Sequence, residues 1–343
     1  MNTIGLTEKL PSWEELKNAT IETYGFKLPN TTTYWVPLHN PKNTLLSWDD
    51  FTSIFKKIYS DIQITTEKMI FQIYTPESHT IEIFNTAVSH CQVAWVHDSY
   101  CQTRTLFKTA RDWDPSNIQD CIPIQPNSYE RIEWLGDRTI QSIMGNYLSW
   151  RFPDCQEGFL TKANSKLVRT GCLGTCAKWI GFSKFLILSR FHDDFLHSRD
   201  DLRILEDSFE AFIGCLSQTT NKKYGTLVVT DFVFRLLEHI IDIPSFLNTD
   251  ENYKDLLMQY YHKSHNGSFP TYSEQGVEES VQDGQTKRMT RMAVHDPNGA
   301  ILKTALGISK KEAEQNAAKL ACIHYGIDFF DGGMPFYLSP IAT

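Results

Sequence analysis

Long hydrophobic runs are missing from this chain of 343 residues. No stretch approaches the roughly 18 consecutive apolar residues that a membrane-spanning helix needs, which excludes a membrane-spanning protein. The first twenty residues contain no basic start followed by an apolar core, so we expect no secretory signal and an intracellular protein, cytoplasmic or nuclear. In such a compartment the 8 cysteines are expected to be free thiols.

Paired cysteine motifs and an excess of positive charge are missing too. Cys172 and Cys176 lie four apart, without a second pair or a nearby His cluster, so we expect no structural zinc site. Lys and Arg number 33 against 41 Asp and Glu, a net charge of −8. Taken alone, this balance argues mildly against a nucleic-acid partner. Binding depends, however, on where the cations lie and on any metal ion that the acids recruit.

The chain divides into segments whose residue patterns differ. Residues 1–79 are rich in aromatic residues and turn signals, and we interpret them as an N-terminal extension of unknown role. Residues 80–246 are interpreted as an all-α domain, because apolar residues recur there mostly at spacings of three and four. Its predicted helices cover about 129–150, 164–180, 202–216 and 232–243, and residues 98–128 are predicted to form a long loop.

A polar linker near residue 250 precedes a second domain with a different pattern. Residues 250–327 predict an α+β module in the order helix, three strands, helix. The predicted elements are 253–263, 270–277, 287–294, 300–306 and 309–325. The segment Asp296-Pro297-Asn298-Gly299 is a strong hairpin signal, because Asn and Gly tolerate positive φ. Residues 328–343 remain as a C-terminal tail.

Acidic residues recur on one face of the first predicted helix. Glu130, Glu133 and Asp137 lie at positions i, i+3 and i+7, within roughly 60° of one another around the helix. A solvated acidic face is the plain interpretation. Bulky apolar residues between the acids argue against it, and Gly136, which costs about 1 kcal/mol in a helix interior, indicates the close approach of another group.

A second acidic pair lies about seventy residues further along. Asp207 and Glu210 are spaced i, i+3 in the helix predicted at 202–216. Two helices that each present carboxylates can converge on one cation, and all-oxygen ligands favour Mg²⁺, for which Mn²⁺ can substitute. Such an ion lowers the pKa of a bound water and stabilises charge on a phosphate. The residues by themselves therefore predict a metal-dependent phosphodiesterase.

Four ordered motifs resemble those of the ribonuclease III family. The segment from Tyr129 to Asp137 is similar to its signature, usually Asn-Glu-Arg-Leu-Glu-Phe-Leu-Gly-Asp, and the segment from Asp207 to Gly214 is similar to its second acidic motif. Residues 157–160 with 166–168 resemble the family's Glu-Gly motif, and residues 85–90 resemble its opening helix. The resemblance covers about residues 80–330. It implies a homodimeric endoribonuclease that hydrolyses double-stranded RNA with Mg²⁺.

The resemblance also implies roles for particular residues. Glu133, Asp137, Asp207 and Glu210 match the catalytic carboxylates that coordinate the metal. Glu130 and Glu157 match acidic positions that support the cleft. Trp134 stands where the family usually has a Phe that inserts into the partner subunit, so the resemblance places Trp134 in a dimer interface.

The last predicted helix has features of its own. Ser309 and Glu312 form a Ser-x-x-Glu pattern that predicts a capping box at the helix start. Lys310 and Lys311 then lie in the first turn, where the helix dipole disfavours cations. The simplest interpretation is that both lysines are exposed to solvent and cost the helix little stability. The alternative is a phosphate bound at the helix N-terminus, which both the dipole and the lysines would stabilise.

This module resembles a double-stranded-RNA-binding domain. By position, the RNA contacts implied by the resemblance are Gln259, the loop from Gly284 to Lys287, Lys310 and Lys311. Two features depart from the family: the usual third lysine is Glu314, and residues 250–327 contain 9 Lys and Arg against 10 Asp and Glu. We therefore expect weak, salt-sensitive RNA binding.

Two other functions are alternatives to the endoribonuclease. A non-catalytic protein that binds or sequesters double-stranded RNA would typically have lost the carboxylates, and all four are present. A metal-dependent enzyme acting on a small phosphorylated substrate would have no need of the C-terminal module.

Overall fold

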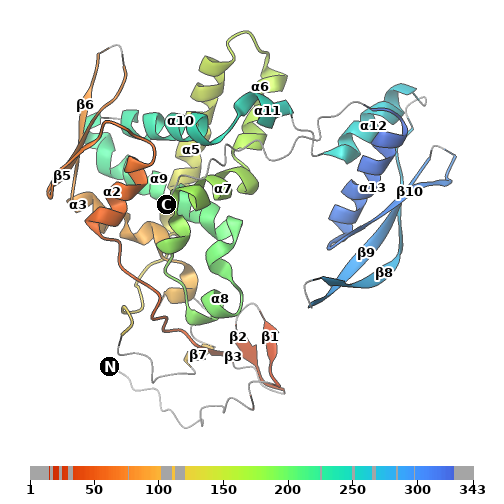
Figure 1. Ribbon diagram of the computed structural model, residues 1–343, viewed down its shortest axis with the longest axis horizontal. Coiled ribbons are helices and arrows are strands. Elements are labelled where there is room, and N and C mark those ends of the chain that lie inside the picture. Colours follow the sequence, from red (N-terminus) through yellow and green to blue (C-terminus); the bar gives the residue numbers. More distant parts are fainter. Residues whose placement is uncertain are drawn as a thin grey trace. The chain divides into compact units, whose positions relative to one another are not determined.

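A computed structural model divides the chain into two compact units, Met1–Ile240 and Ile241–Thr343, which are described here one at a time (Figure 1). The structure describes residues 15, 18–22, 25–29, 34–75, 77–101, 110–112, 120–224, 226–248, 252–264, 268–282, 285–296 and 298–327. The predicted C-terminal tail, 328–343, lies outside the described residues. Within the described residues, no helix is long and apolar enough to cross a membrane.

The centre of the first unit is a pair of long helices, α5 (Glu130–Arg151) and α9 (Leu202–Tyr224). They pack against each other, and further helices surround them (Figure 1). The surrounding helices are α3 (Thr86–Cys91), α6 (Glu157–Leu167), α7 (Thr170–Ile180), α8 (Arg190–Asp194) and α10 (Leu227–Ile240). The helical prediction for this domain is thus confirmed in its main elements.

The prediction of one helix over residues 164–180 is wrong. Helix α6 ends at Leu167 and α7 begins at Thr170, because Arg169 adopts an extended backbone (φ −81°, ψ 156°). The break redirects the chain so that α7 packs against α9. At this contact a Cβ atom on Gly174 would overlap the carbonyl oxygen of Leu202. Tertiary packing therefore overrides the continuous helical pattern.

Two small sheets belong to the first unit. The first has the strand order β1 (Thr20–Glu22), β2 (Gly25–Lys27), β3 (Tyr34–Val36), β7 (Ala110–Asp112). The second joins β4 (Gln63–Ile64), β5 (Lys68–Gln72) and β6 (Thr80–Phe84) in antiparallel order. The prediction of an all-α domain from Thr80 onward is therefore wrong at β6, and β7 lies within residues 98–128, where the sequence predicted a loop. Ile81 and Ile83 are buried while their neighbours are more exposed, which is the alternation of a strand.

Residues before position 80 supply part of the core of the first unit. Helix α2 (Trp48–Lys56) places Phe51 and Phe55 against Phe212 of α9, with ring centroids 6.3 and 6.2 Å away. Phe55 also contacts Phe232 of α10 at 5.3 Å. A boundary at residue 79 would also separate the paired strands β5 and β6. The N-terminal residues, in which the sequence shows no motif, are therefore integral to this fold.

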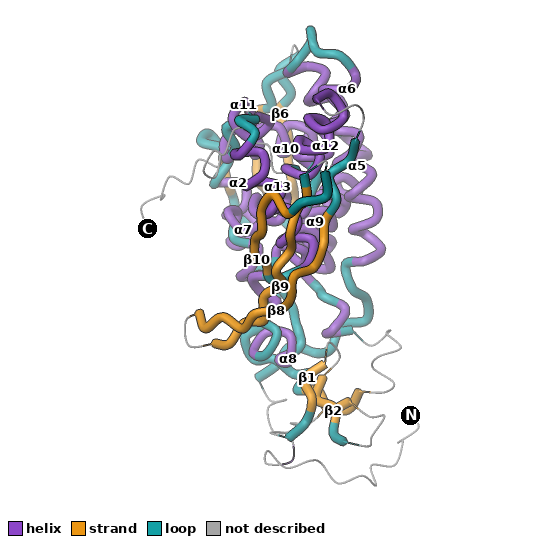
Figure 2. The backbone as a smooth tube through the Cα atoms, turned by 90° about the vertical axis from the view of Figure 1, so that its right-hand side faces the viewer, coloured by secondary structure: helices purple, strands orange, loops and turns teal. Residues whose placement is uncertain are grey.

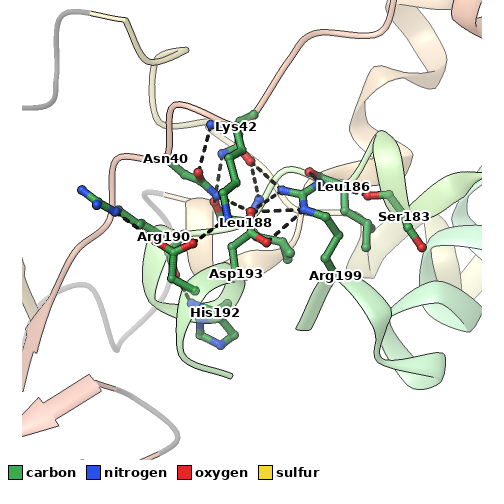
Figure 3. A network of polar contacts seen from close by, with 12 residues as sticks. Asn40, Lys42, Ser183, Leu186, Leu188, Arg190, His192, Asp193 and Arg199 are labelled. Carbon is green, nitrogen blue, oxygen red and sulfur yellow. Dashed lines mark hydrogen bonds and ion pairs between the residues drawn. The ribbon is translucent and has the colours of Figure 1, made fainter. Parts of the chain in front are cut away.

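A buried polar network connects the N-terminal segment to the region around α8 (Figure 3). Arg199 donates to Asp193 at 2.6 Å and to the carbonyl oxygens of Ser183 and Leu186 at 3.0 and 2.8 Å. The Nδ2 atom of Asn40 donates to the same Asp193 at 2.8 Å. Because Asp193 and Arg199 each have several hydrogen-bond partners, the ion pair is stabilised despite its burial, and it anchors the chain that leads into α9.

The second unit has the predicted helix–strand–strand–strand–helix order. Its elements are α11 (Ile243–Asn248), α12 (Tyr253–Ser264), β8 (Tyr272–Gln282), β9 (Gln285–His295), β10 (Ile301–Gly307) and α13 (Lys310–His324). The strands lie side by side in the order β10-β9-β8 (Figure 2). Helices α12 and α13 pack through Leu257, Tyr261, Ala317 and Ala321 over Val294 of the sheet.

The predicted hairpin between β9 and β10 is confirmed. The backbone N–H of Asp296 donates to the carbonyl oxygen of Ala300 at 2.8 Å, and Gly299 has φ +86°. Positive φ is the reason that this position favours glycine.

Candidate functional site

The closest approach of α5 and α9 places their acidic motifs side by side. A Cβ atom on Gly136 of α5 would overlap the carbonyl oxygen of Glu210 of α9. On the other side, a Cβ atom on Gly214 of α9 would overlap the carbonyl oxygen of Ile132. The close approach predicted from Gly136 is therefore a helix–helix contact. It brings the backbone of Glu210 against the helix that carries Glu133 and Asp137.

The carboxylates of the two helices interact electrostatically. The pKa of Asp207 is raised to about 7, mainly by burial and also by the charges of Glu133 and Glu206. The pKa of Glu210 is likewise raised to about 8, mainly by burial and also by the charges of Asp137, Glu206, Glu133 and Asp207. Like charges disfavour the ionised form of each acid. The structure thus brings together all four acids that the sequence singled out.

Glu133 shares this environment, together with an acid that the sequence analysis did not select. The pKa of Glu133 is raised by burial and by the charges of Glu130, Asp137 and Glu206. Glu206 contributes to the raised pKa of Glu133, Asp207 and Glu210 alike. Only its position directly before Asp207 in the sequence indicated that Glu206 belongs to the acidic site. Helical spacing within α9 does not show that Glu206 lies near α5.

Hydrogen bonds orient the acids on α5 and at the start of α6. Gln141 Nε2 donates to Asp137 Oδ1 at 3.4 Å, and Asn164 of α6 donates to Gln141 Oε1 at 3.2 Å. Glu157, the first residue of α6, is exposed and accepts a hydrogen bond from Thr161 Oγ1 at 2.8 Å. Glu130, the first residue of α5, is exposed. Glu130 and Glu157 therefore lie at helix starts, more open to solvent than Glu210.

The donor set suits a hard divalent cation. The four predicted ligands are carboxylates, whose oxygens Mg²⁺ and Mn²⁺ prefer. Burial and neighbouring acids disfavour the ionised forms of Asp207 and Glu210, whose pKa values are raised, and Asp137 is paired with Arg138 at 3.1 Å. A divalent cation would stabilise the ionised forms. Among the described residues, no three His, Cys, Asp or Glu side chains are gathered in an arrangement that could hold a metal ion.

Trp134 lies on the surface of α5. Its side chain is 64% exposed, while Ile132 and Leu135 beside it are half-buried. An exposed Trp is unusual, because its large apolar ring gains free energy when it is covered. The structure therefore shows that Trp134 does not belong to the core of its own chain.

The start of α13 presents two lysines to solvent. Ser309 caps the helix by accepting from Glu312 N, as predicted. The reciprocal bond of the predicted capping box is displaced by one residue, because Glu312 Oε2 accepts from Ile308 N at 3.1 Å. Lys310 is 61% exposed with Glu274 Oε2 at 3.8 Å, and Lys311 is exposed as well.

Of the remaining predicted RNA-contacting residues, the structure describes Gln259 fully, Lys287 by its backbone alone, and Gly284 not at all. Gln259 on α12 is exposed and donates to Asp255 Oδ2 at 2.8 Å. Gly284 lies outside the described residues. Lys287 belongs to β9 by its backbone, and its side chain is outside the description.

Glu314, at the position of the family's usual third lysine, faces into the second unit. Its Oε2 atom forms an ion pair of 2.6 Å with Lys254 Nζ of α12, and the side chain is only 17% exposed. Lys254 also lies over the ring of Tyr272, 4.7 Å from its centroid. The Glu314 charge is thus compensated inside the unit.

Two family models match this chain, one in each unit. The model of the ribonuclease III domain matches residues 130–221, and that of the double-stranded RNA binding motif matches residues 253–325. A probable ribonuclease 3 of Acanthamoeba polyphaga mimivirus is 31% identical over 229 residues, which cover 66% of this chain and 39% of that protein. Ribonuclease 3 of Lactococcus lactis subsp. cremoris (strain MG1363) is 31% identical over 220 residues, which cover 63% of this chain and 88% of the bacterial protein.

Among solved structures, the nuclease domain of ribonuclease III from Campylobacter jejuni matches 44% of this chain and 85% of its own. The TM-score is 0.33 and the sequence identity 23%.

Proposed function

Because this chain belongs to the ribonuclease III family of double-stranded-RNA endoribonucleases, we propose that it cleaves RNA duplexes by metal-dependent hydrolysis at the carboxylates of α5 and α9. The observation that supports this proposal best is the contact between Gly136 and the backbone of Glu210, which unites the two acidic motifs. A bound cation would stabilise the ionised forms of several acids that are gathered in one partly buried place.

Glu133, Asp137, Asp207 and Glu210 are the residues that would hold Mg²⁺ or Mn²⁺ in this proposal. The ion when bound supplies an activated water and stabilises charge on the scissile phosphate. The chain's own contribution is to keep the acids close and partly dehydrated, and to hold Asp137 through Gln141. Glu130 and Glu157, at the exposed starts of α5 and α6, support the cleft on its open side.

The proposed reaction also requires a homodimer, because each chain supplies a single catalytic site. The chain contains one pair of acidic motifs, and cutting both strands of a duplex requires two such sites. Trp134 is the proposed anchor in the dimer interface, because an exposed Trp is the kind of residue that contributes most to interfaces when it is buried.

We assign residues 80–246 to the endonuclease domain, 250–327 to the RNA-binding domain, and 1–79 to an extension that completes the endonuclease core. In the RNA-binding domain, Lys310 and Lys311 would contact phosphates at the N-terminus of α13, with Gln259, Gly284 and Lys287 as the other contacts. Phosphates bind at helix N-termini because free N–H groups and the helix dipole attract anions.

Incubation of the full chain with labelled RNA tests the proposal. Duplex and single-stranded RNA of equal length are each incubated with Mg²⁺ and with a chelator, and the same preparation is weighed by sedimentation equilibrium. We expect cleavage of the duplex alone, only with Mg²⁺, by a protein of dimeric mass. Duplex binding without cleavage under every metal condition would favour the alternative of a non-catalytic RNA-binding or sequestering protein.

Replacing Lys310 and Lys311 together with Ala is expected to weaken binding about equally for duplexes of unrelated sequence. A-form RNA is recognised mainly by shape and backbone, so loss of phosphate contacts affects every duplex. The slope of log affinity against log salt should shrink by roughly one to two units. Titrations of two unrelated duplexes at several salt concentrations measure both quantities.

Lys303→Ala, a lysine of β10 in the same unit, is the matched control and should leave the slope unchanged. The fold of the double variant should persist, because the Ser309 cap remains. Unchanged affinity together with an unchanged slope would contradict the role given to the two lysines.

The stability of the metal-free protein is expected to fall as the pH rises from about 4 to about 8. The pKa values of Asp207 and Glu210 are raised to about 7 and about 8, whereas unfolded Asp and Glu titrate near about 3.9 and 4.3. In this window the folded protein binds more protons than the unfolded chain, so the free energy of unfolding decreases with pH. Mg²⁺ should therefore raise the melting temperature more at about pH 8 than at about pH 6.

Thermal unfolding with Mg²⁺ and with a chelator at both pH values provides the measurement. The double variant Asp207→Asn, Glu210→Gln should lose most of this pH dependence. An equal effect of Mg²⁺ at both pH values would be evidence against a cation at these acids.

A further inference from the structure

Tyr129 joins the acidic site from the position directly before α5. The side chain is 3% exposed, and its hydroxyl donates to Asp207 Oδ2 at 3.3 Å, across the contact between α5 and α9. This separation is longer than the roughly 2.7–2.8 Å typical of hydroxyl donors. The contact therefore orients the carboxylate without strongly neutralising it.

The ring of Tyr129 is held in place by the segment around His97. The backbone N–H of Tyr129 donates to the carbonyl oxygen of Val96 at 2.9 Å. The His97 ring packs against the Tyr129 ring edge to face, with centroids 5.9 Å apart. His97 is itself fixed, since its Nδ1 atom lies 2.8 Å from Ser99 Oγ and its backbone N–H donates to Ile187 at 3.0 Å. The hydroxyl thus has a defined position.

The same segment also anchors α9 next to Asp207. Ser208 is fully buried, and its Oγ donates to the carbonyl oxygen of Ala94 at 2.9 Å. Residues 94–99 therefore hold Asp207 from two directions: through Ser208 they fix its backbone, and through Tyr129 they fix one of its oxygens. If Tyr129 only filled space in the core, its aromatic ring would be sufficient and its hydroxyl would have no role.

We propose that Tyr129 is a positioning residue for Asp207: its hydroxyl restrains one carboxylate oxygen so that the other is directed toward the ion. This inference rests on the proposed function, because it gives Asp207 a metal to bind. Tyr129 replaces the Asn that is usual in the family signature, so the restraint is a property of this chain. Groups that orient metal ligands typically change metal affinity by roughly 10- to 100-fold when they are removed, and the long contact places Tyr129 at the lower end of that range.

The test compares Tyr129→Phe with Tyr147→Phe in the full chain. Both variants keep the ring and remove one hydroxyl from the region of α5. Tyr147 donates to Glu238 Oε1 at 2.6 Å and is fully buried, and Glu238 is not among the proposed ligands. Binding of Mn²⁺ without RNA is followed by electron paramagnetic resonance, and the Mg²⁺ concentration for half-maximal duplex cleavage is measured in parallel. Asp207→Asn defines which Mn²⁺ signal belongs to the site.

For Tyr129→Phe we expect the Mn²⁺ dissociation constant and the half-saturating Mg²⁺ concentration each to rise about tenfold. The maximal rate at saturating Mg²⁺ and the KM for RNA should stay within about twofold of the wild type, since saturation compensates for weaker binding. Tyr147→Phe should lower the melting temperature without changing either metal parameter.

Two negative results have different meanings. If the wild type binds Mn²⁺ and cleaves duplexes while Tyr129→Phe matches it in both metal parameters, the positioning role is overturned and the proposed function stands. If the wild type itself neither binds Mn²⁺ nor cleaves, and Asp207→Asn changes nothing, then the proposed function fails and the inference fails with it.

Discussion

Glu210→Gln is expected to reduce duplex cleavage by about a hundredfold or more while duplex binding persists. The substitution removes one negative oxygen ligand from a residue that is only 9% exposed and whose backbone lies against Gly136. The fold should tolerate it, because the raised pKa of about 8 keeps most of Glu210 protonated near neutral pH in the metal-free protein. Gln resembles that neutral form in size and hydrogen bonding. Initial rates at millimolar Mg²⁺ and duplex affinity with chelator are the two measurements.

Glu238→Gln provides a matched control within the same unit. Glu238 accepts hydrogen bonds from Tyr147 at 2.6 Å and from Arg151 at 3.0 Å, so its loss should lower stability and leave the maximal cleavage rate almost unchanged. Asp137→Asn should behave like Glu210→Gln. Near-normal cleavage by Glu210→Gln at millimolar Mg²⁺ would refute the assignment of Glu210 to the metal site.

Gly136→Ala is expected to destabilise the first unit by about 3 kcal/mol or more. The added methyl group would overlap the backbone carbonyl of Glu210, and a backbone atom inside a packed helix has no free rotation by which to move away. The helices must separate, which displaces Glu210 and lowers cleavage as well. For a unit of this size the melting temperature should fall by roughly 10 °C. Thermal unfolding and cleavage rates are measured together.

Gly145→Ala on the same helix is the control. Gly145 is exposed and has no other group within 4 Å of an added Cβ. Ala favours the helix by roughly 0.5–1 kcal/mol, so this variant should be slightly more stable and fully active. If both glycine variants behaved alike, the contact at Gly136 would not be the one that unites the acidic motifs.

Local patterns in the sequence were sufficient for much of the candidate site. The spacing of Glu133 and Asp137, and of Asp207 and Glu210, placed each pair on one helix face, since helical geometry is set by a repeat of 3.6 residues. Gly136 signalled a close approach before its partner was known. The hairpin at Asp296 and the Ser309 cap were predicted for the same reason, because turns and caps depend on neighbours only a few residues away.

Contacts between distant segments were decided by the tertiary structure alone. Tyr129 and Asp207 are 78 positions apart, and the spacing within either motif carries no information about the other. Nothing in the sequence around Phe51 and Phe55 indicates that their rings contact α9 and α10. The interruption between helices α6 and α7 at Arg169 also follows from packing. A sequence determines which residues share a helix face through short-range geometry, whereas the partner of that face is selected by the burial of apolar surface and the pairing of buried polar groups across the whole fold.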